Sequence, residues 1–422
     1  MPTRVIVQVH PSVGDAEARV RRRPIGRDND AFQEMLASLM RLAKVLDDLG
    51  YWGLSHTEHH FHSEGLELSP DPGLYDLYLG QHTTRLHHGQ LGFVLPTHDP
   101  IRLAERCSMI DHMLQGRFFV GLARGYQHRW VDVLGQRMHA RTASFADRDA
   151  DLENRRLFAE HFRVMRMAWT QDLLQYKGPS YEVPAPYDEG IAAWPPAEVT
   201  RRFGVPGEVD DDGRVVGVSV VPKPYQQPHP PIFQGNSTSA GTVEWCAREG
   251  IIPTMLTTPD DAVFELARRY REVALASGHD VAPGEKVGIV RSFMLCERPG
   301  DLERQAARHN DFIWRDWYQS FGFLEGMRRP GESGPVPQPG ETVASRLLES
   351  GMIVGGTVDE VRARVERMVD AGLEYLVWHL PWGIVPEAEL VDQLGVFAQS
   401  VMGELDMVDA ARQVLAGNAA GS

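Results

Sequence analysis

Three short apolar or β-rich runs in the first third of the chain each end abruptly in polar, ionisable residues. The first run precedes Glu58-His59-His60-Phe61, the second leads into Thr97-His98-Asp99, and the third ends at Ala123-Arg124-Gly125. Strands of a β/α barrel have this form, because they are buried along their length and present functional side chains at their C-terminal ends. The three runs therefore favour a barrel of parallel strands with a site at one mouth.

Strand and helix signals alternate along the whole chain, which predicts a parallel sheet. The expected strands lie at residues 5–9, 89–95, 232–233, 251–256, 287–296 and 375–379. The expected helices lie at residues 31–49, from 69 onward, 100–115, 237–249, 358–372 and 390–401. An open doubly wound sheet would give the same alternation. No G-x-G-x-x-G follows the first strand, so a (β/α)8 TIM barrel with long inserted loops is favoured.

Residues at the expected helix boundaries support this alternation. Gly50 is placed to end the first long helix as a left-handed C′ residue. Ser69-Pro70 and Asp99-Pro100 each combine a capping residue with a following proline, which predicts two helix starts. Thr357 and Glu360 have the spacing of a capping box.

The length of 422 residues fits one elaborated barrel domain covering residues 1–422, since a barrel needs about 250 residues or more. Three polar or Pro- and Gly-rich segments interrupt the alternation, at residues 136–148, 184–231 and 328–341. The second of these is too long for an ordinary barrel connection. We expect the three to be insertions, with at least one acting as a lid over the barrel mouth.

Charge and composition exclude several classes of partner. The formal net charge is −15, which argues against nucleic acid or an anionic membrane surface. No apolar stretch approaches the length of a membrane span, and the first residues do not resemble a signal peptide. The three cysteines, Cys107, Cys246 and Cys296, are widely spaced and predict neither a disulfide framework nor a zinc site. These features predict a cytoplasmic protein.

The histidines around the first motif allow three interpretations. His56, His59, His60 and His62 could be metal ligands, but adjacent strand residues point to opposite faces and no second cluster completes a site, so no metal is expected. The imidazoles could instead form hydrogen bonds that only stabilise the barrel. In the third interpretation, one histidine faces the mouth and transfers protons, a role that its near-neutral pKa suits.

A helix start rich in small hydroxyl residues follows the expected strand at residues 232–233. Its sequence is Ser237-Thr238-Ser239-Ala240-Gly241-Thr242. Backbone N–H groups at such a start can bind a phosphate, and barrels often hold one near their late loops. The sequence leaves this possibility and a plain helix cap equally open.

Taken together, these motifs resemble the bacterial luciferase-like flavin-dependent monooxygenases, in the branch that uses FMN. The resemblance runs from Val5 to about Leu405 and implies a TIM barrel. It implies that His59 lies beside the flavin as the proton-transfer group, with Glu58 orienting a histidine. It also implies an unusual non-proline cis peptide at Leu91–Gly92, next to the flavin ring.

The resemblance extends to the cofactor phosphate. Ser239 and Thr242 match the family's contact positions at the helix start, and Arg124 and Arg155 match two arginines that complete the phosphate site. Ala123 departs from the luciferases, which have a cysteine there, so luminescence is not expected.

The activity implied by the resemblance is that of a two-component monooxygenase. Reduced FMN from a separate flavin reductase would react with O2, and a flavin C4a-peroxide would oxygenate a small organic substrate by Baeyer–Villiger, aldehyde or related oxidation. A homodimer is expected through the helix at residues 100–115, which carries Met109 and Met113 beside its apolar face. Two alternatives remain open: a hydride-transferring oxidoreductase that uses the deazaflavin F420, and a non-catalytic flavin-binding partner subunit.

Overall fold

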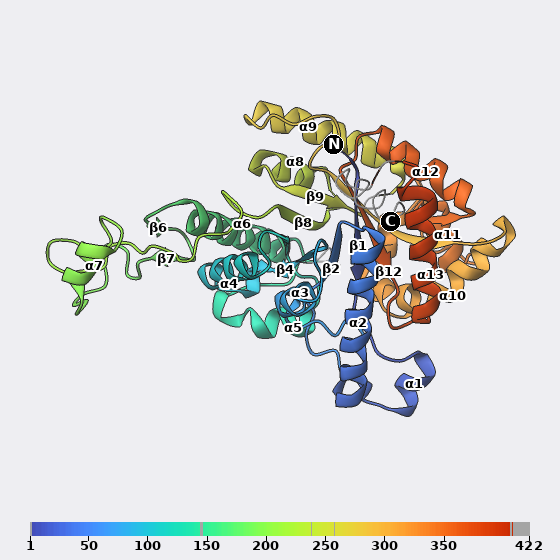
Figure 1. Ribbon diagram of the computed structural model, residues 1–422, viewed down its shortest axis with the longest axis horizontal. Coiled ribbons are helices and arrows are strands. Elements are labelled where there is room, and N and C mark those ends of the chain that lie inside the picture. Colours follow the sequence, from blue (N-terminus) through green and yellow to red (C-terminus); the bar gives the residue numbers. More distant parts are fainter. Residues whose placement is uncertain (1, 144–146, 238, 257, 406, 408–422) are drawn as a thin grey trace, which may run out of the picture. The chain divides into compact units, whose positions relative to one another are not determined.

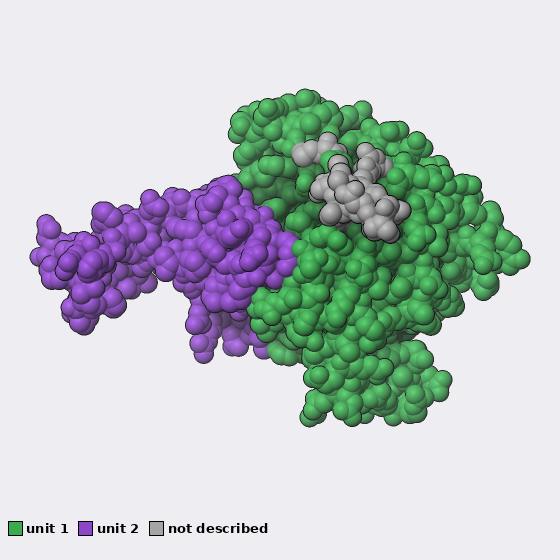
Figure 2. Space-filling model, in the orientation of Figure 1, with its two compact units in different colours: residues 1–93, 119–121, 231–422 green, residues 94–118, 122–230 purple. Residues whose placement is uncertain are grey.

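The computed structural model describes residues 2–407 except 144–146, 238, 257 and 406. Two compact units can be distinguished in the chain (Figure 2). Unit 1 comprises residues 1–93, 119–121 and 231–422, and unit 2 comprises residues 94–118 and 122–230. That the whole chain forms a single domain stays a prediction.

Among the described residues, eight strands close into a ring (Figure 1). In order around the ring they are β1 (Arg4–Val9), β2 (Gly53–His56), β3 (His87–Gln90), β5 (Phe118–Ala123), β8 (Ile232–Ser237), β9 (Ile252–Met255), β10 (Gly288–Leu295) and β12 (Tyr375–Leu380). Two further strands join the sheet: β4 (Phe93–Val94) pairs with β5, and β11 (Ile353–Gly356) pairs with β10. The fold is a closed barrel of eight parallel strands with surrounding helices, which confirms the predicted (β/α)8 TIM barrel.

The inside of the barrel is built in layers along the strands. One buried cluster of apolar side chains fills it, and its members include Ile6, Phe233, Val290, Tyr375 and Val377. Because side chains alternate between the two faces of a strand, the residue two places after each member also points inward. These residues form a second layer inside the barrel, closer to the C-terminal ends of the strands, and its side chains need not be apolar.

The described part of unit 1 also contains α-helices between and after the barrel strands. They are α1 (Ala16–Arg21), α2 (Asn29–Leu49), α3 (Pro72–Gly80), α8 (Ala240–Glu249), α9 (Asp260–Ala276), α10 (Leu302–Asp316), α11 (Val343–Glu349), α12 (Val358–Asp370) and α13 (Glu387–Phe397). The short helices are η1 (Ile25–Arg27), η4 (Pro299–Asp301), η5 (Tyr318–Phe321), η6 (Phe323–Met327) and η7 (Ala398–Met402), of which the last is a π-helix.

Most of the predicted helix boundaries are confirmed. Gly50 ends α2 with φ of 85°, the left-handed conformation that glycine adopts at low cost. Thr357 and Glu360 form both bonds of the capping box that begins α12. The start predicted at Ser69-Pro70 is wrong by two residues, because Asp71 caps α3 and Pro72 is its first residue.

Unit 2 holds most of the inserted sequence. Its elements are η2 (Leu95–Thr97), α4 (Pro100–Met113), α5 (His128–Leu134), η3 (Gln136–Met138), α6 (Arg148–Thr170), the antiparallel pair β6 (Tyr176–Lys177) and β7 (Glu182–Val183), and α7 (Ala197–Phe203). Helices α4 and α6 pack together, and Trp169 donates a hydrogen bond to the Ala104 carbonyl at 3.0 Å. The predicted insertion at 184–231 contains α7 and ends just before β8, and residues 144–146 of the insertion at 136–148 lie outside the described residues.

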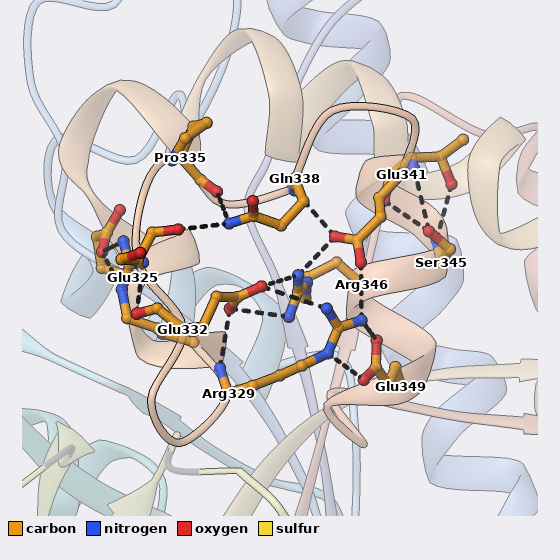
Figure 3. A network of polar contacts seen from close by, with 12 residues as sticks. Glu325, Arg329, Glu332, Pro335, Gln338, Glu341, Ser345, Arg346 and Glu349 are labelled. Carbon is orange, nitrogen blue, oxygen red and sulfur yellow. Dashed lines mark hydrogen bonds and ion pairs between the residues drawn. The ribbon is translucent and has the colours of Figure 1, made fainter.

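Charged side chains fasten the third predicted insertion, residues 328–341, to α11 (Figure 3). Arg346 is 1% exposed and donates hydrogen bonds to Glu332 at 2.6 Å and to Glu341 at 2.5 Å. Arg329 contacts the same two carboxylates and also Glu349 on α11. The segment is thus held by a network of two guanidinium groups and three carboxylates. A lid role for any of the three insertions stays a prediction.

In the described part of the chain, no helix is long and apolar enough to cross a membrane. The three cysteines are free thiols, and Cys107 and Cys246 are buried.

Candidate active site

A polar layer lies above the apolar interior, at the C-terminal ends of the barrel strands. Gln8 on β1 is in register with Ser55 on β2 and with His379 on β12, and His379 is in register with Ser292 on β10. All four side chains are buried. Within the described residues, Gln8 Oε1, Ser55 Oγ and Ser292 Oγ have no hydrogen-bond partner. Buried polar atoms are normally satisfied, so three unsatisfied ones at one end of a barrel indicate a place for a polar ligand.

The histidine motif lies in the loop that follows β2, because that strand ends at His56. His59 is 5% exposed, and its backbone N–H donates to the Ser69 carbonyl at 3.0 Å. Its Nδ1 lies 3.0 Å from Thr57 Oγ1. This places the predicted proton-transfer group in a buried position on a loop at the C-terminal end of the strands.

Glu58 pairs with the second histidine of the motif and not with the first. Its Oε1 lies 2.9 Å from His60 Nε2, and the two side chains are 2% and 17% exposed. The expectation that Glu58 orients a histidine therefore concerns His60 in this structure.

Glu67, which the sequence analysis did not single out, lies at the centre of the site. Its carboxylate is fully buried and accepts hydrogen bonds from Tyr318 Oη and Trp317 Nε1, both at 3.0 Å. Three imidazole nitrogens surround it: His10 Nδ1 and His62 Nδ1 at 3.5 Å and His59 Nε2 at 3.8 Å. One carboxylate thus faces histidines from the loop just after β1 and from the β2–α3 loop, and aromatic residues from the segment after α10.

Burial and charge act in opposite directions on these groups. Burial lowers the pKa of His59 and of His379 to about 4, and Glu67 opposes the shift in both. Burial also lowers the pKa of His10. For Glu67, burial disfavours the charge, but the imidazoles of His59, His10 and His62 and the Trp317 N–H outweigh it, so its pKa lies below the usual value. Near neutral pH the Glu67 carboxylate is therefore anionic, and the imidazoles of His10 and His59 beside it are neutral.

A cavity of about 270 Å³ reaches this cluster within unit 1. His59, His62 and Glu67 form its polar wall. The rest of its lining comes from η1, the first turn of α2 and the β2–α3 loop: Gly26, Arg27, Phe32, Phe61, Ser63, Leu68 and Pro70. A small molecule in this cavity would contact the imidazole of His59 directly.

The peptide bond between Leu91 and Gly92 is cis, as the family resemblance implied. The Leu91 N–H donates to the His56 carbonyl at 2.7 Å, which places this bond beside the end of β2. The neighbouring backbone packs very closely, since a Cβ on Gly121 would lie 1.8 Å from the Gln90 carbonyl oxygen. Only glycine fits on β5 at that position.

The four predicted phosphate contacts fall into two pairs, one in each unit. In unit 2, Asp151 on α6 joins Arg124 and Arg155, at 2.6 Å and 2.8 Å. Burial lowers the pKa of Arg124, while the Asp151 hydrogen bond opposes the shift. In unit 1, Ser239 caps α8, and its Oγ accepts from the Thr242 N–H at 3.3 Å. Arg124 and Arg155 thus share one carboxylate and Ser239 and Thr242 form a helix cap, while a phosphate contact for any of the four stays a prediction.

Sequence reasoning missed His10, Glu67, Trp317, Tyr318 and His379. Two of these could have been found from the sequence, because a polar residue at the end of a predicted strand was the signal for the other motifs. His10 directly follows one predicted strand and His379 ends another. Glu67, Trp317 and Tyr318 lie in loops or short helices, where no periodicity indicates their direction. In the described chain, no group of three or more His, Cys, Asp or Glu side chains is arranged to hold a metal ion.

Comparison with known proteins places this chain in a family. The family model described as luciferase-like monooxygenase matches residues 22–375. The alkanal monooxygenase alpha chain of Photorhabdus luminescens is 27% identical over 254 residues, which cover 59% of this chain and 56% of that relative. The chain belongs to the luciferase-like monooxygenase family.

Solved structures with similar folds include enzymes with two kinds of cofactor. One is the oxygenating constituent of 3,6-diketocamphane monooxygenase from Pseudomonas putida, a type II Baeyer–Villiger monooxygenase in complex with FMN; it is 17% identical, with a TM-score of 0.69 over 96% of this chain and 98% of that one. Another is an F420-dependent secondary alcohol dehydrogenase in complex with an F420–acetone adduct; it is 13% identical, with a TM-score of 0.60 over 97% and 100% of the two chains.

Proposed function

We propose that this protein is the oxygenating component of a two-component monooxygenase, which uses reduced FMN from a separate flavin reductase and O2 to oxygenate a small organic substrate. The observation that carries the proposal is the buried His59 at a barrel mouth with unsatisfied polar atoms, in a chain of the luciferase-like family. Bound reduced FMN would supply the electrons that activate O2.

The residues present fit a flavin. Gln8, Ser55 and Ser292 offer unsatisfied polar atoms inside the barrel, and a flavin ring has carbonyl and N–H groups that can bond to such atoms. Ser239 and Thr242 at the start of α8, together with Arg124 and Arg155, have the chemistry to hold the phosphate. The bond between Leu91 and Gly92 is the position at which the ring is expected to stack.

The protein's own contribution is to position the reactants, exclude water and control protons. His59 is neutral near pH 7 because burial lowers its pKa to about 4, so its N–H can donate a hydrogen bond without a charge, and the imidazole becomes charged only while it holds a transferred proton. The apolar cavity lining, with Phe32, Phe61 and Leu68, would hold the organic substrate beside that imidazole and keep water away.

Cofactor choice provides the decisive experiment. The purified chain would be mixed anaerobically with reduced FMN or reduced F420, and oxygen uptake would then be followed after O2 is admitted, with and without candidate ketones and aldehydes. Substrate-dependent oxygen uptake with reduced FMN, and gain of one oxygen atom in the product by mass spectrometry, would support the proposal. Oxygen-independent hydride transfer with F420 would replace it with the alternative suggested by the second structural neighbour. Flavin binding without turnover of any substrate would favour a non-catalytic partner subunit.

We also propose that the protein is a homodimer that pairs through α4. Met109 and Met113 on this helix are 48% and 50% exposed, although methionine usually lies in protein interiors. Sedimentation at micromolar concentration should give twice the 47.3 kDa chain mass, and Met109→Glu should shift the protein toward monomer. A strict monomer for the unmodified protein would contradict this assembly.

A further inference from the structure

A directed chain of hydrogen bonds leads from the barrel interior to Glu67. Gln8 Nε2 donates to His10 Nε2 at 3.1 Å, so the proton of a neutral His10 lies on Nδ1. That Nδ1 then donates to Tyr318 Oη at 2.6 Å, and the single Tyr318 proton is left for Glu67 Oε1 at 3.0 Å. Each bond fixes the direction of the next, and the chain ends on a carboxylate, which can only accept.

The same carboxylate faces His59. Thr57 Oγ1 lies 3.0 Å from Nδ1 of this imidazole, and Glu67 Oε1 lies 3.8 Å from its Nε2. An N–H directed at an anion is favoured, whereas a nitrogen lone pair directed at it is repelled, and the buried setting strengthens both effects. The geometry therefore favours a proton on Nε2 of His59, with Nδ1 accepting from the Thr57 hydroxyl.

We propose that Glu67 is the positioning residue of this site: its buried carboxylate selects the Nε2–H tautomer of His59 and holds that N–H at the wall of the cavity. The inference rests on the proposed function only in taking His59 as the proton-transfer group. Glu67 itself is assigned no contact with substrate or cofactor.

The cost of placing a carboxylate here indicates that the arrangement serves more than packing. A fully buried carboxylate loses its hydration, and the bonds from Trp317 and Tyr318 offset only part of that loss. The backbone of Glu67 also has φ of 48°, a left-handed conformation that non-glycine residues seldom adopt. Such conformations concentrate at functional sites.

The other side chains that surround the Glu67 carboxylate come from several elements of the fold. His10, His62 and His379 face the cluster from the loop just after β1, the β2–α3 loop and β12. Trp317 and Tyr318 face it from the segment after α10. The pKa of His59 is lowered by burial and raised in part by Glu67, so loss of the carboxylate should lower it further.

The test measures the tautomer of His59 in a protein without cofactor or substrate. Protein labelled with ¹⁵N-histidine would be studied by NMR near pH 7.5, with a His59→Gln variant to assign the resonances. Glu67→Gln removes the charge and keeps one of the two acceptor oxygens, so either Trp317 or Tyr318 retains its partner. The matched control is Glu389→Gln, which removes a carboxylate 2.8 Å from the Nε2 atom of His309, another buried histidine. Thermal unfolding of both variants would verify that they fold.

The expected result is a shift of about tenfold in the His59 tautomer ratio toward Nδ1–H in Glu67→Gln, with no change at His59 in Glu389→Gln. The proposal is overturned if His59 keeps the Nε2–H form in Glu67→Gln and loses it in Thr57→Val, because Thr57 alone would then set the tautomer.

A second measurement separates this inference from the proposed function. With reduced FMN, Glu67→Gln should lower product formation at least about tenfold, as part of the 10²–10⁴-fold typical of a positioned acid–base group. A shifted tautomer with an unchanged rate would support the role of Glu67 and contradict the role of His59 in catalysis.

Discussion

Asp260 accepts two hydrogen bonds from Arg291, whose guanidinium is completely buried, at 3.0 Å and 3.2 Å. Arg291 lies on β10 and Asp260 begins α9, so the pair joins the barrel wall to a covering helix. Arg364 on α12 donates two more bonds to the same carboxylate. Burial lowers the pKa of Arg291 to about 10 and Asp260 opposes the shift, so the guanidinium remains charged at neutral pH.

Replacing Asp260 by Ala should therefore destabilise the protein strongly. The change leaves the buried charge of Arg291 uncompensated, which typically costs about 3–5 kcal/mol. Asp261→Ala is the matched control, because Asp261 is 82% exposed and its pair with Arg367 lies at the surface, where such pairs contribute at most about 1 kcal/mol. Urea unfolding of the two variants would compare their free energies of unfolding. Equal losses would contradict a structural role for the buried pair.

A second buried carboxylate links the segment just before β3 to the end of α2. Asp47 accepts hydrogen bonds from the backbone N–H groups of Thr84, Arg85 and Leu86, at 2.7–2.9 Å. Asp47→Ala should cost at least about 2 kcal/mol of unfolding free energy, since a buried donor without a partner costs about 1–3 kcal/mol. The adjacent Asp48 is exposed, and Asp48→Ala should change stability by less than about 0.5 kcal/mol. A small loss in both variants would show that water satisfies these donors.

The sequence predicted the alternating strands and helices because their periodicity depends on local composition, whereas the missing G-x-G-x-x-G and the family resemblance favoured a closed barrel over an open sheet. It also placed the cis bond at Leu91–Gly92 through the family resemblance, and His59 in a buried position at a strand end. It could not place Glu67 or Tyr318, which meet although 251 positions separate them in the chain. Such a contact depends on how two loops fold over the barrel, and loops carry no periodic signal. The partner of Glu58 was also beyond the sequence, since either histidine of the motif was within its reach.

Stability should fall in mild acid because several histidines are buried in the neutral form. The pKa of His379 is lowered to about 4 by burial, while an unfolded histidine has a pKa near 6.5. Between these values the unfolded state binds more protons, so the unfolding free energy decreases as the pH falls from 6.5 to 4 and the contribution levels off below that. His379→Gln should make this slope shallower by up to about 1.4 kcal/mol per pH unit. Unfolding curves at several pH values would measure it, and above pH 7.5 the two slopes should coincide. An unchanged slope at pH 4–6.5 would mean that His379 is charged or hydrated in the folded state.

Arg124 should matter for FMN more than for riboflavin, because only FMN carries a phosphate. The Arg124→Ala variant removes one cation of the pair held by Asp151. Affinity for FMN should fall about tenfold or more, as expected when a charge-assisted hydrogen bond is lost, while riboflavin affinity changes little. Arg141→Ala is the control, since Arg141 is 48% exposed and pairs with Asp147 at the surface. Fluorescence titration of each variant with both ligands gives the comparison, and equal loss for both ligands would remove the phosphate assignment.

The two histidines of the motif should differ in their effects on catalysis. His59 lies in the wall of the cavity with Glu67 and is proposed to transfer protons, so His59→Ala should lower product formation about 10²–10⁴-fold with little change in FMN affinity. His60 is bonded to Glu58, and His60→Ala removes one partner of a nearly buried carboxylate, which should lower the melting temperature more than the rate. Product formation, peroxide release and thermal unfolding would be measured for both variants with the same reductase. If His60→Ala abolishes turnover while His59→Ala keeps a normal rate and coupling, His60 is the proton-transfer residue and the Glu58–His60 pair, not the Glu67 cluster, is the catalytic unit.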